Sequence, residues 1–166
     1  MPVVYHNRSR LDAAIEAELG ARWLTKDELL AAADHLVIVV PYSVASHHLI
    51  GAAELQRMKR TATLTNIARG GIVDDAALAR ALRDGTIAAA GLDVFEGEPS
   101  VHPDLLSVPN VVLTPHIASA SLPTRRAMAR LAADNLIAAL DSRPGAATPP
   151  TPLNPEVLGA RAAAKL

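Results

Sequence analysis

Arg69 stands where a short apolar segment ends and a glycine turn begins. Residues 61–67 predict a buried strand with a polar end, and Gly70 and Gly71 permit backbone angles that other residues resist. Asp74 then predicts the N-cap of a helix. Open α/β sheets bind ligands at the carboxyl ends of their strands, and a guanidinium there suits a carboxylate or a phosphate. These residues alone leave a second interpretation equally open, in which Arg69 pairs with a nearby Asp or Glu.

Two further segments place ionisable side chains just after strands. The predicted strand 86–94 has Asp93 at its end and leads into a loop that carries Glu98. The next strand end carries His116. Each of these residues, taken singly, is more often structural than catalytic. All three, like Arg69, follow strands of one parallel sheet, so we expect them to meet at one edge. Four ionisable groups that converge in this way indicate an active site.

Strands and helices alternate along the whole chain. The hydrophobic pattern predicts strands at residues 2–5, 36–40, 61–67, 86–94 and 111–114, and helices at 11–19, 26–33, 43–58 (with a break near Gly51), 74–85 and 121–140. Residues 36–40 are apolar throughout, as in strands covered on both faces. Thr25 and Glu28 predict a capping box. The alternation predicts an α/β fold with a doubly wound parallel sheet, and residues 142–155, rich in Pro, Gly and Thr, predict an extended tail.

Composition excludes several classes of function. The chain has 166 residues, a formal net charge of −1 and 2% aromatic residues, so it lacks the basic and aromatic surface of a nucleic-acid-binding protein. It has no cysteine, which rules out disulfides and thiolate metal sites. Its longest apolar run is too short to span a bilayer, and its start does not resemble a signal peptide. We therefore expect a cytoplasmic protein without nucleic-acid or membrane partners. The adjacent His47 and His48 could suggest a metal site, but neighbours on a helix point apart. They are therefore interpreted as a solvated helix start, and no metal site is expected.

Three blocks of sequence resemble one known family, the D-isomer-specific 2-hydroxyacid dehydrogenases. They occur in the family's order and spacing and are Asn66-x-x-Arg69-Gly70-x-x-Val73-Asp74, Gly91-Leu92-Asp93-Val94-Phe95-x-x-Glu98-Pro99 and Thr114-Pro115-His116-Ile117-Ala118-Ser119. The branch that the chain resembles is that of the glyoxylate/hydroxypyruvate and 2-ketogluconate reductases. The resemblance implies a partial NAD(P)-binding domain at residues 1–141, followed by a remnant of the substrate domain at 142–166.

The resemblance also implies roles for individual residues. Arg69 would hold the carboxylate of a small 2-oxo acid and polarise its 2-oxo group. His116 would be the general acid that protonates this oxygen as hydride arrives at carbon. Glu98 would bond the other ring nitrogen, fix the tautomer and favour the imidazolium. The cofactor-binding residues on the nicotinamide side would be Asp93, as acceptor for the carboxamide, together with Pro41, Ile67, His116 and Ala118.

The turn after the first predicted strand bears on the choice of cofactor. NAD-preferring folds of this class place an acidic residue there to bind the ribose 2′-hydroxyl. The turn is instead Asn7-Arg8-Ser9-Arg10, which favours a 2′-phosphate and therefore NADP over NAD, with NAD still possible. A solvated loop that precedes a helix is the alternative.

One part of the family's pattern is missing. The Gly-x-Gly-x-x-Gly turn that cradles the pyrophosphate does not occur in the sequence, and the strand that precedes it is not predicted either. In the sheet order 3-2-1-4-5-6 this strand lies at the centre, so we expect a Rossmann-like sheet with a gap and exposed strand edges. Two hypotheses follow. The chain is the cofactor side of an oxidoreductase, homodimeric in its full-length form, or it is a non-catalytic remnant or corepressor-like binding module.

Overall fold

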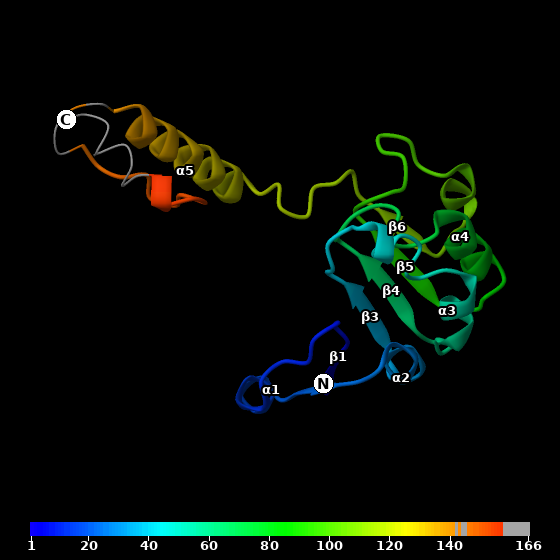
Figure 1. The fold of residues 1–166 in the computed structure, drawn as a ribbon. Helices are drawn as coiled ribbons and strands as arrows, with labels where there is room; N and C mark the ends of the chain where they lie inside the picture. Colours follow the sequence, from blue (N-terminus) through cyan, green and yellow to red (C-terminus); the bar gives the residue numbers. More distant parts are fainter. Residues whose placement is uncertain (142, 144–145, 158–166) are drawn as a thin grey trace. The chain divides into compact units, whose positions relative to one another are not determined.

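The computed structural model describes residues 1–141, 143 and 146–157 and has alternating strands and helices (Figure 1). They are β1 (Val3–Tyr5), α1 (Ala13–Leu19), β2 (Ala21–Trp23), α2 (Lys26–Ala32), β3 (His35–Ile38), the 3₁₀ turn η1 (Val44–Ser46), α3 (Ala52–Arg57), β4 (Thr63–Asn66), α4 (Asp75–Arg83), β5 (Ala89–Leu92), the 3₁₀ turn η2 (Pro103–Ser107), β6 (Val111–Leu113) and α5 (Leu122–Leu140). The chain divides into two compact units, unit 1 at residues 1–116 and unit 2 at 117–166.

All strand pairs in unit 1 are parallel, which confirms the predicted α/β class. β3, β4, β5 and β6 form one sheet in that order, with Leu36 opposite Leu64 and Leu64 opposite Ala90. β1 and β2 form a separate two-stranded sheet. β1 and β3 are not paired with each other, and a cavity of about 630 Å³ is lined by residues of β1, α2 and β3. The expected gap therefore lies between β1 and β3.

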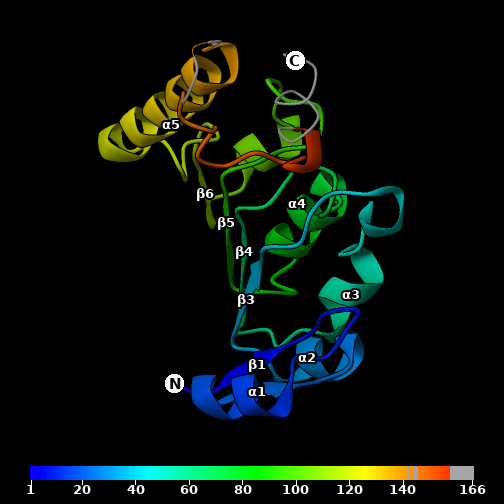
Figure 2. The same ribbon diagram turned by 60° about the vertical axis from the view of Figure 1, so that its left-hand side comes forward.

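The core of unit 1 lies on one face of the four-stranded sheet. Figure 2 shows α3 and α4 on this face, and Leu64, Ile72 and Leu78 are fully buried there. On the opposite face Val37 is 53% exposed and Val112 is 68% exposed. The prediction that residues 36–40 are covered on both faces is wrong for the described structure, because β3 alternates buried and exposed side chains as a strand covered on one face does.

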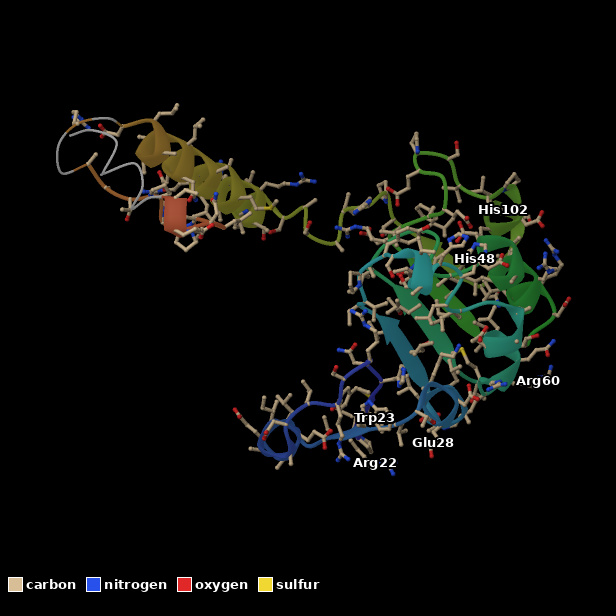
Figure 3. The ribbon with its side chains drawn as sticks, viewed as in Figure 1. Arg22, Trp23, Glu28, His48, Arg60 and His102 are labelled. Carbon is tan, nitrogen blue, oxygen red and sulfur yellow. The ribbon has the colours of Figure 1, made fainter. Side chains whose placement is uncertain are left out.

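Two element predictions were also wrong. β2 was not predicted, because it has only three residues and its central Arg22 is exposed, so no apolar run marks it. Figure 3 shows Arg22 and Trp23 of β2 near Glu28 of α2. The expected helix at 43–58 is instead η1, an irregular segment with a bridge from Ile50 to Val73, and α3. The other elements agree with the predictions within a few residues, including the capping box of Thr25 and Glu28.

A buried carboxylate holds the β1–α1–β2 segment together. Glu16 of α1 is 8% exposed, and its two oxygens accept hydrogen bonds from Arg10 at 2.8 and 2.7 Å. The hydroxyl of Tyr5 donates to the same carboxylate at 2.6 Å. Arg10 first and Tyr5 second lower the pKa of Glu16 to about 2. The turn that carries Arg10 thus has a carboxylate partner, supplied by the following helix.

Unit 2 contains α5, which Ser121 caps by accepting a hydrogen bond from the backbone of Thr124. No side chain of α5 is buried in the described structure. Among the described residues, no helix combines the length and the apolar character that crossing a membrane requires. The predicted domain boundary at residue 141 stays a prediction, and part of the predicted tail, residues 142, 144–145 and 158–166, lies outside the described residues.

Replacement of Glu16 by Gln tests this segment. A depressed pKa in the folded state means that the ionised carboxylate stabilises the fold above its unfolded pKa near 4.5, and that this stabilisation is lost as pH falls toward about 2. Trp23 is the only tryptophan and lies in β2, so its fluorescence reports on this segment. We expect acid unfolding between pH 4.5 and 2 in the wild type, and a weaker pH dependence in Glu16→Gln, which is already destabilised at pH 7. Glu18→Gln, on the exposed face of α1, should behave as the wild type; equal pH dependence in both variants would contradict the role of Glu16.

Candidate active site

The turn after β4 is built around a buried asparagine. Asn66 is 2% exposed, its side-chain oxygen accepts a hydrogen bond from the backbone of Ala68 at 3.1 Å, and its amide donates to the carbonyl of Arg69 at 3.1 Å. Gly70 follows, and a Cβ on it would lie 1.8 Å from the carbonyl oxygen of Phe95. The glycine therefore lets the Arg69 turn pack directly against the loop that carries Glu98.

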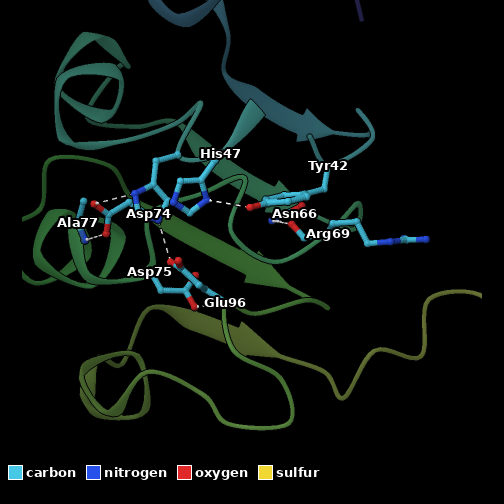
Figure 4. A network of polar contacts seen from close by, with 9 residues as sticks. Tyr42, His47, Asn66, Arg69, Asp74, Asp75, Ala77 and Glu96 are labelled. Carbon is cyan, nitrogen blue, oxygen red and sulfur yellow. Dashed lines mark hydrogen bonds and ion pairs between the residues drawn. The ribbon is translucent and has the colours of Figure 1, made fainter. Parts of the chain in front are cut away.

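The guanidinium of Arg69 has no carboxylate partner among the described residues. Within the described residues, the guanidinium donates one hydrogen bond, to the carbonyl of Ala68 at 2.6 Å. Figure 4 shows the side chain extending away from Asp74, Asp75 and Glu96. The interpretation in which Arg69 pairs with a nearby acidic residue therefore does not describe this structure, and the side chain is available to an anionic ligand.

Glu98 and His116 form a hydrogen-bonded pair. Glu98 Oε2 lies 2.8 Å from Nδ1 of His116, and Glu98 Oε1 accepts a hydrogen bond from the backbone of Phe95 at 2.9 Å. The bond to His116 is the main reason that the pKa of Glu98 is lowered. The carboxylate therefore stays ionised and can only accept, which makes Nδ1 the donor and leaves Nε2 for proton exchange with a ligand.

A cavity of about 440 Å³ brings these side chains together. Its lining includes Arg69, Glu98 and His116, which come from the ends of three successive strands. Tyr42, His47 and Glu96 complete the polar part of the lining. The expectation that residues after β4, β5 and β6 converge at one edge of the sheet thus agrees with the geometry. The unpaired guanidinium of Arg69 can bind the carboxylate of an acid. The imidazole of His116, which Glu98 orients, can exchange a proton with the same molecule.

Asp93 has a different environment from the other carboxylates. It is 4% exposed, accepts a hydrogen bond from the hydroxyl of Thr114 at 2.5 Å, and its backbone nitrogen bonds the carbonyl of Asn66. It follows β5 as expected but does not line the 440 Å³ cavity. Its predicted contact with a carboxamide stays a prediction.

The remaining predicted cofactor residues lie at other strand ends. Ile67 is 44% exposed after β4, and the carbonyl of Pro41, after β3, accepts a hydrogen bond from Ser46. Arg10 is bound to Glu16, so Arg8 and Ser9 are the exposed side chains of the turn after β1 that remain for a phosphate. Asn7 orders this turn, because its side chain accepts from the backbone of Arg8 and its carbonyl accepts from Trp23. Ala118 belongs to unit 2, and its role stays a prediction.

Sequence reasoning missed the residues that fasten the site. Asp75 is 4% exposed, and its carboxylate accepts a hydrogen bond from the backbone of Glu96 at 3.0 Å. Burial raises the pKa of this carboxyl. Asp75 directly follows the N-cap residue Asp74, and two consecutive acidic residues are common in a first helical turn. Nothing in the sequence therefore distinguished the buried residue from the capping one.

The chain is similar to known reductases. The family model for the D-isomer specific 2-hydroxyacid dehydrogenase NAD-binding domain matches residues 1–118. A glyoxylate reductase of Thermococcus onnurineus is 49% identical over 161 residues, which are 97% of this chain and 47% of that protein. Glyoxylate/hydroxypyruvate reductase B of Erwinia tasmaniensis is 50% identical over 144 residues, 86% of this chain and 44% of the relative. The chain thus spans about half the length of the curated relatives it matches.

A solved structure gives the same result. The NADPH-dependent glyoxylate/hydroxypyruvate reductase of Sinorhizobium meliloti, crystallised with NADP and malonate, superposes with a TM-score of 0.75 at 44% identity. The match covers 88% of this chain and 44% of that one. Fold and sequence therefore point to the same family.

Replacement of Gly70 by Ala tests the packing of the site. The added Cβ would overlap the backbone of Phe95, which cannot move without displacing the Glu98 loop, so we expect a loss of at least ~1–3 kcal/mol of unfolding free energy in urea titrations. Gly91→Ala is the matched control, because its Cβ would meet only Thr65 at 3.9 Å, and it should cost less than about 1 kcal/mol. Equal losses in the two variants would contradict the close approach at Gly70.

Proposed function

Because the chain belongs to the D-isomer specific 2-hydroxyacid dehydrogenase family, we propose that it is the cofactor side of an oxidoreductase that acts on a small 2-oxo acid. Glyoxylate and hydroxypyruvate are the proposed substrates, since similar proteins carry these names. The observation that carries the proposal is the 2.8 Å pair of Glu98 and His116 in one cavity with the unpaired Arg69.

Each residue of this set has a distinct proposed task. The guanidinium of Arg69 binds the substrate carboxylate through its planar fork and orients the 2-oxo group. NAD(P)H, when bound, supplies the hydride. His116 donates the proton of Nε2 to the developing alkoxide oxygen, while Glu98 holds Nδ1 and thereby fixes which nitrogen reacts. In the reverse direction the same Nε2 accepts the proton of the hydroxyl group.

The residues of unit 1 fit the two ends of a dinucleotide. Exposed Ile67, with Pro41 nearby at the end of the neighbouring strand, supplies apolar surface for the nicotinamide side. Exposed Arg8 and Ser9 supply donors for a ribose phosphate. We propose NADP as the preferred cofactor on this basis. Asp93 and Ala118 are the further proposed contacts, and a homodimer is the proposed assembly of the full-length protein.

The interruption of the sheet between β1 and β3 supports a second candidate function. A pyrophosphate is normally cradled by a glycine turn at a helix N-terminus, and that motif is absent from the sequence. The second candidate is a binding module without catalysis. Binding of a 2-oxo acid without its turnover in the presence of NADPH or NADH would favour it over the oxidoreductase.

The catalytic set is tested by kinetics of the protein as its gene encodes it, with glyoxylate and hydroxypyruvate. His116→Ala should lower kcat by ~10²–10⁴-fold, the usual contribution of general acid catalysis. Arg69→Lys should chiefly raise KM, because the bidentate fork is lost. Arg83→Lys changes an exposed residue that lines neither cavity and should leave both constants unchanged. Full turnover in His116→Ala would overturn its assignment as the acid.

The cofactor choice is tested by the ratio of kcat/KM for NADPH to that for NADH. Arg8→Gln should lower this ratio by about tenfold or more, since a charge-assisted bond to phosphate is worth roughly 1.5–3 kcal/mol. Arg22→Gln removes a neighbouring exposed arginine of β2 and should not change the ratio. Arg10→Gln should act mainly on stability through Glu16. A wild-type preference for NADH would contradict the proposal.

A further inference from the structure

Unit 1 holds a second cluster of side chains that the proposed reaction does not use, formed by His47, His48 and Glu96. One ligand atom from each residue lies within 4.8 Å of the other two. His47 and Glu96 also line the 440 Å³ cavity, so the cluster stands at its rim. We propose that this cluster binds a divalent first-row transition metal ion, and that Zn²⁺ is the physiological one.

An unusual backbone conformation creates the cluster. Consecutive residues of a strand or helix direct their side chains apart, which is why the sequence indicated a solvated helix start. His48 instead has φ of 49°, in the left-handed region that L-residues seldom occupy. With this conformation the rings of His47 and His48 stack with centroids 3.9 Å apart and an interplanar angle of 22°. Histidine adopts this conformation more often than most residues do, and such conformations recur at functional sites.

The segments that carry the three residues are fastened to the same stretch of backbone. The backbone nitrogen of His48 donates to the carbonyl of Gly71 at 2.7 Å, and Ile50 pairs with Val73 in a parallel bridge. The backbone nitrogen of Glu96 donates to the buried carboxylate of Asp75 at 3.0 Å. Both backbone segments are therefore held against residues 71–75 before an ion arrives, and only the side chains need to move.

A polar group lies on the Nδ1 side of each imidazole. The hydroxyl of Tyr42 and Nδ1 of His47 are 3.2 Å apart (Figure 4). A carboxylate oxygen of Asp74 lies 4.0 Å from Nδ1 of His48, which is beyond hydrogen-bond distance. Metal-binding histidines commonly use one ring nitrogen for such an outer partner and the other for the metal. This arrangement leaves Nε2 of each ring for the ion. At His48 the ion would replace the proton that Nε2 donates to Glu96 across 2.8 Å.

The donor set selects the class of ion. Two imidazole nitrogens and one carboxylate oxygen match the three-ligand zinc sites that keep a position open, whereas Mg²⁺ and Ca²⁺ prefer oxygen ligands alone. Ligand atoms around a tetrahedral zinc lie roughly 3.4 Å apart. The widest separation in the cluster, up to 4.8 Å, must therefore shorten, and the 2.8 Å between His48 and Glu96 must lengthen. The side chains of His48 and Glu96 are 37% and 43% exposed, so they have room to move. The alternative is that His48 and Glu96 form an ordinary hydrogen bond and take no ion.

The test is a calorimetric titration of the tag-free 166-residue chain with Zn²⁺ in a non-chelating buffer, repeated with Co²⁺ while visible absorption is recorded. We expect one equivalent to bind with a dissociation constant on the order of micromolar and Mg²⁺ not to compete. His48→Gly keeps the left-handed backbone while removing the ligand, and Glu96→Gln is nearly isosteric. His35→Gln is the matched control, an exposed histidine of β3 whose side-chain partner is Thr63.

Each result bears on the proposal. Mutation of a residue that only supports a metal ligand typically lowers metal affinity ~10–100-fold. A loss of Zn²⁺ affinity at least this large in His48→Gly and Glu96→Gln, with wild-type affinity in His35→Gln, would support the proposal. Tyr42→Phe should lose affinity by a smaller factor. Absence of saturable binding in the wild type would overturn the proposal, and so would binding that survives equally in all variants. Circular dichroism identifies a variant that fails to fold. If His48→Gly does not fold, the Zn²⁺ affinity of Glu96→Gln decides between the two outcomes, because this substitution changes an exposed side chain.

Discussion

The contact between Gly70 and the backbone of Phe95 is the constraint on which the site depends. No residue with a Cβ fits at position 70, because that atom would lie 1.8 Å from the carbonyl oxygen of Phe95. The contact joins the turn after β4 to the loop after β5. Arg69 stands on one side of it and Glu98 on the other, and Glu98 in turn holds His116 after β6. Three strand ends are thus linked through one position without a side chain, and the buried Asn66 and Asp75 hold the two partners of this contact in place.

Much of this arrangement could be predicted from the sequence, because its signals are local. The capping box at Thr25, the N-cap at Asp74 and the apolar runs of the strands each depend on neighbours in the chain. The convergence of Arg69, Glu98 and His116 followed from the geometry of parallel sheets alone. What the sequence did not reveal depends on contacts between distant segments. β2 is recognisable only by its pairing with β1, and the stacked histidines only by the conformation at His48.

Two charged residues also differ in a way that only contacts between separate segments reveal. Arg10 and Arg8 are equivalent in the sequence, two basic residues of one turn. In the structure Arg10 is held by Glu16, six residues later, while Arg8 is exposed. Their predicted roles therefore separate only when the fold is known. The proposed functions also belong to different sheets. Arg8, proposed to bind the cofactor phosphate, follows β1 in the two-stranded sheet, whereas the proposed catalytic residues follow strands of the four-stranded sheet.

The order of strands in the larger sheet has a consequence for biosynthesis. β3, β4, β5 and β6 are neighbours in space in the same order in which they occur along the chain. Each new strand therefore adds to an edge formed by the strand translated just before it, without waiting for a distant segment. The paired residues are 28, 26 and 21 positions apart in the three strand pairs, so each pairing closes only the loop made by one connecting segment. Domains commonly fold from the N-terminal side as they leave the ribosome. The sheet can consequently grow during translation, and the turn that holds Arg69 is complete only once the ribosome has passed Phe95.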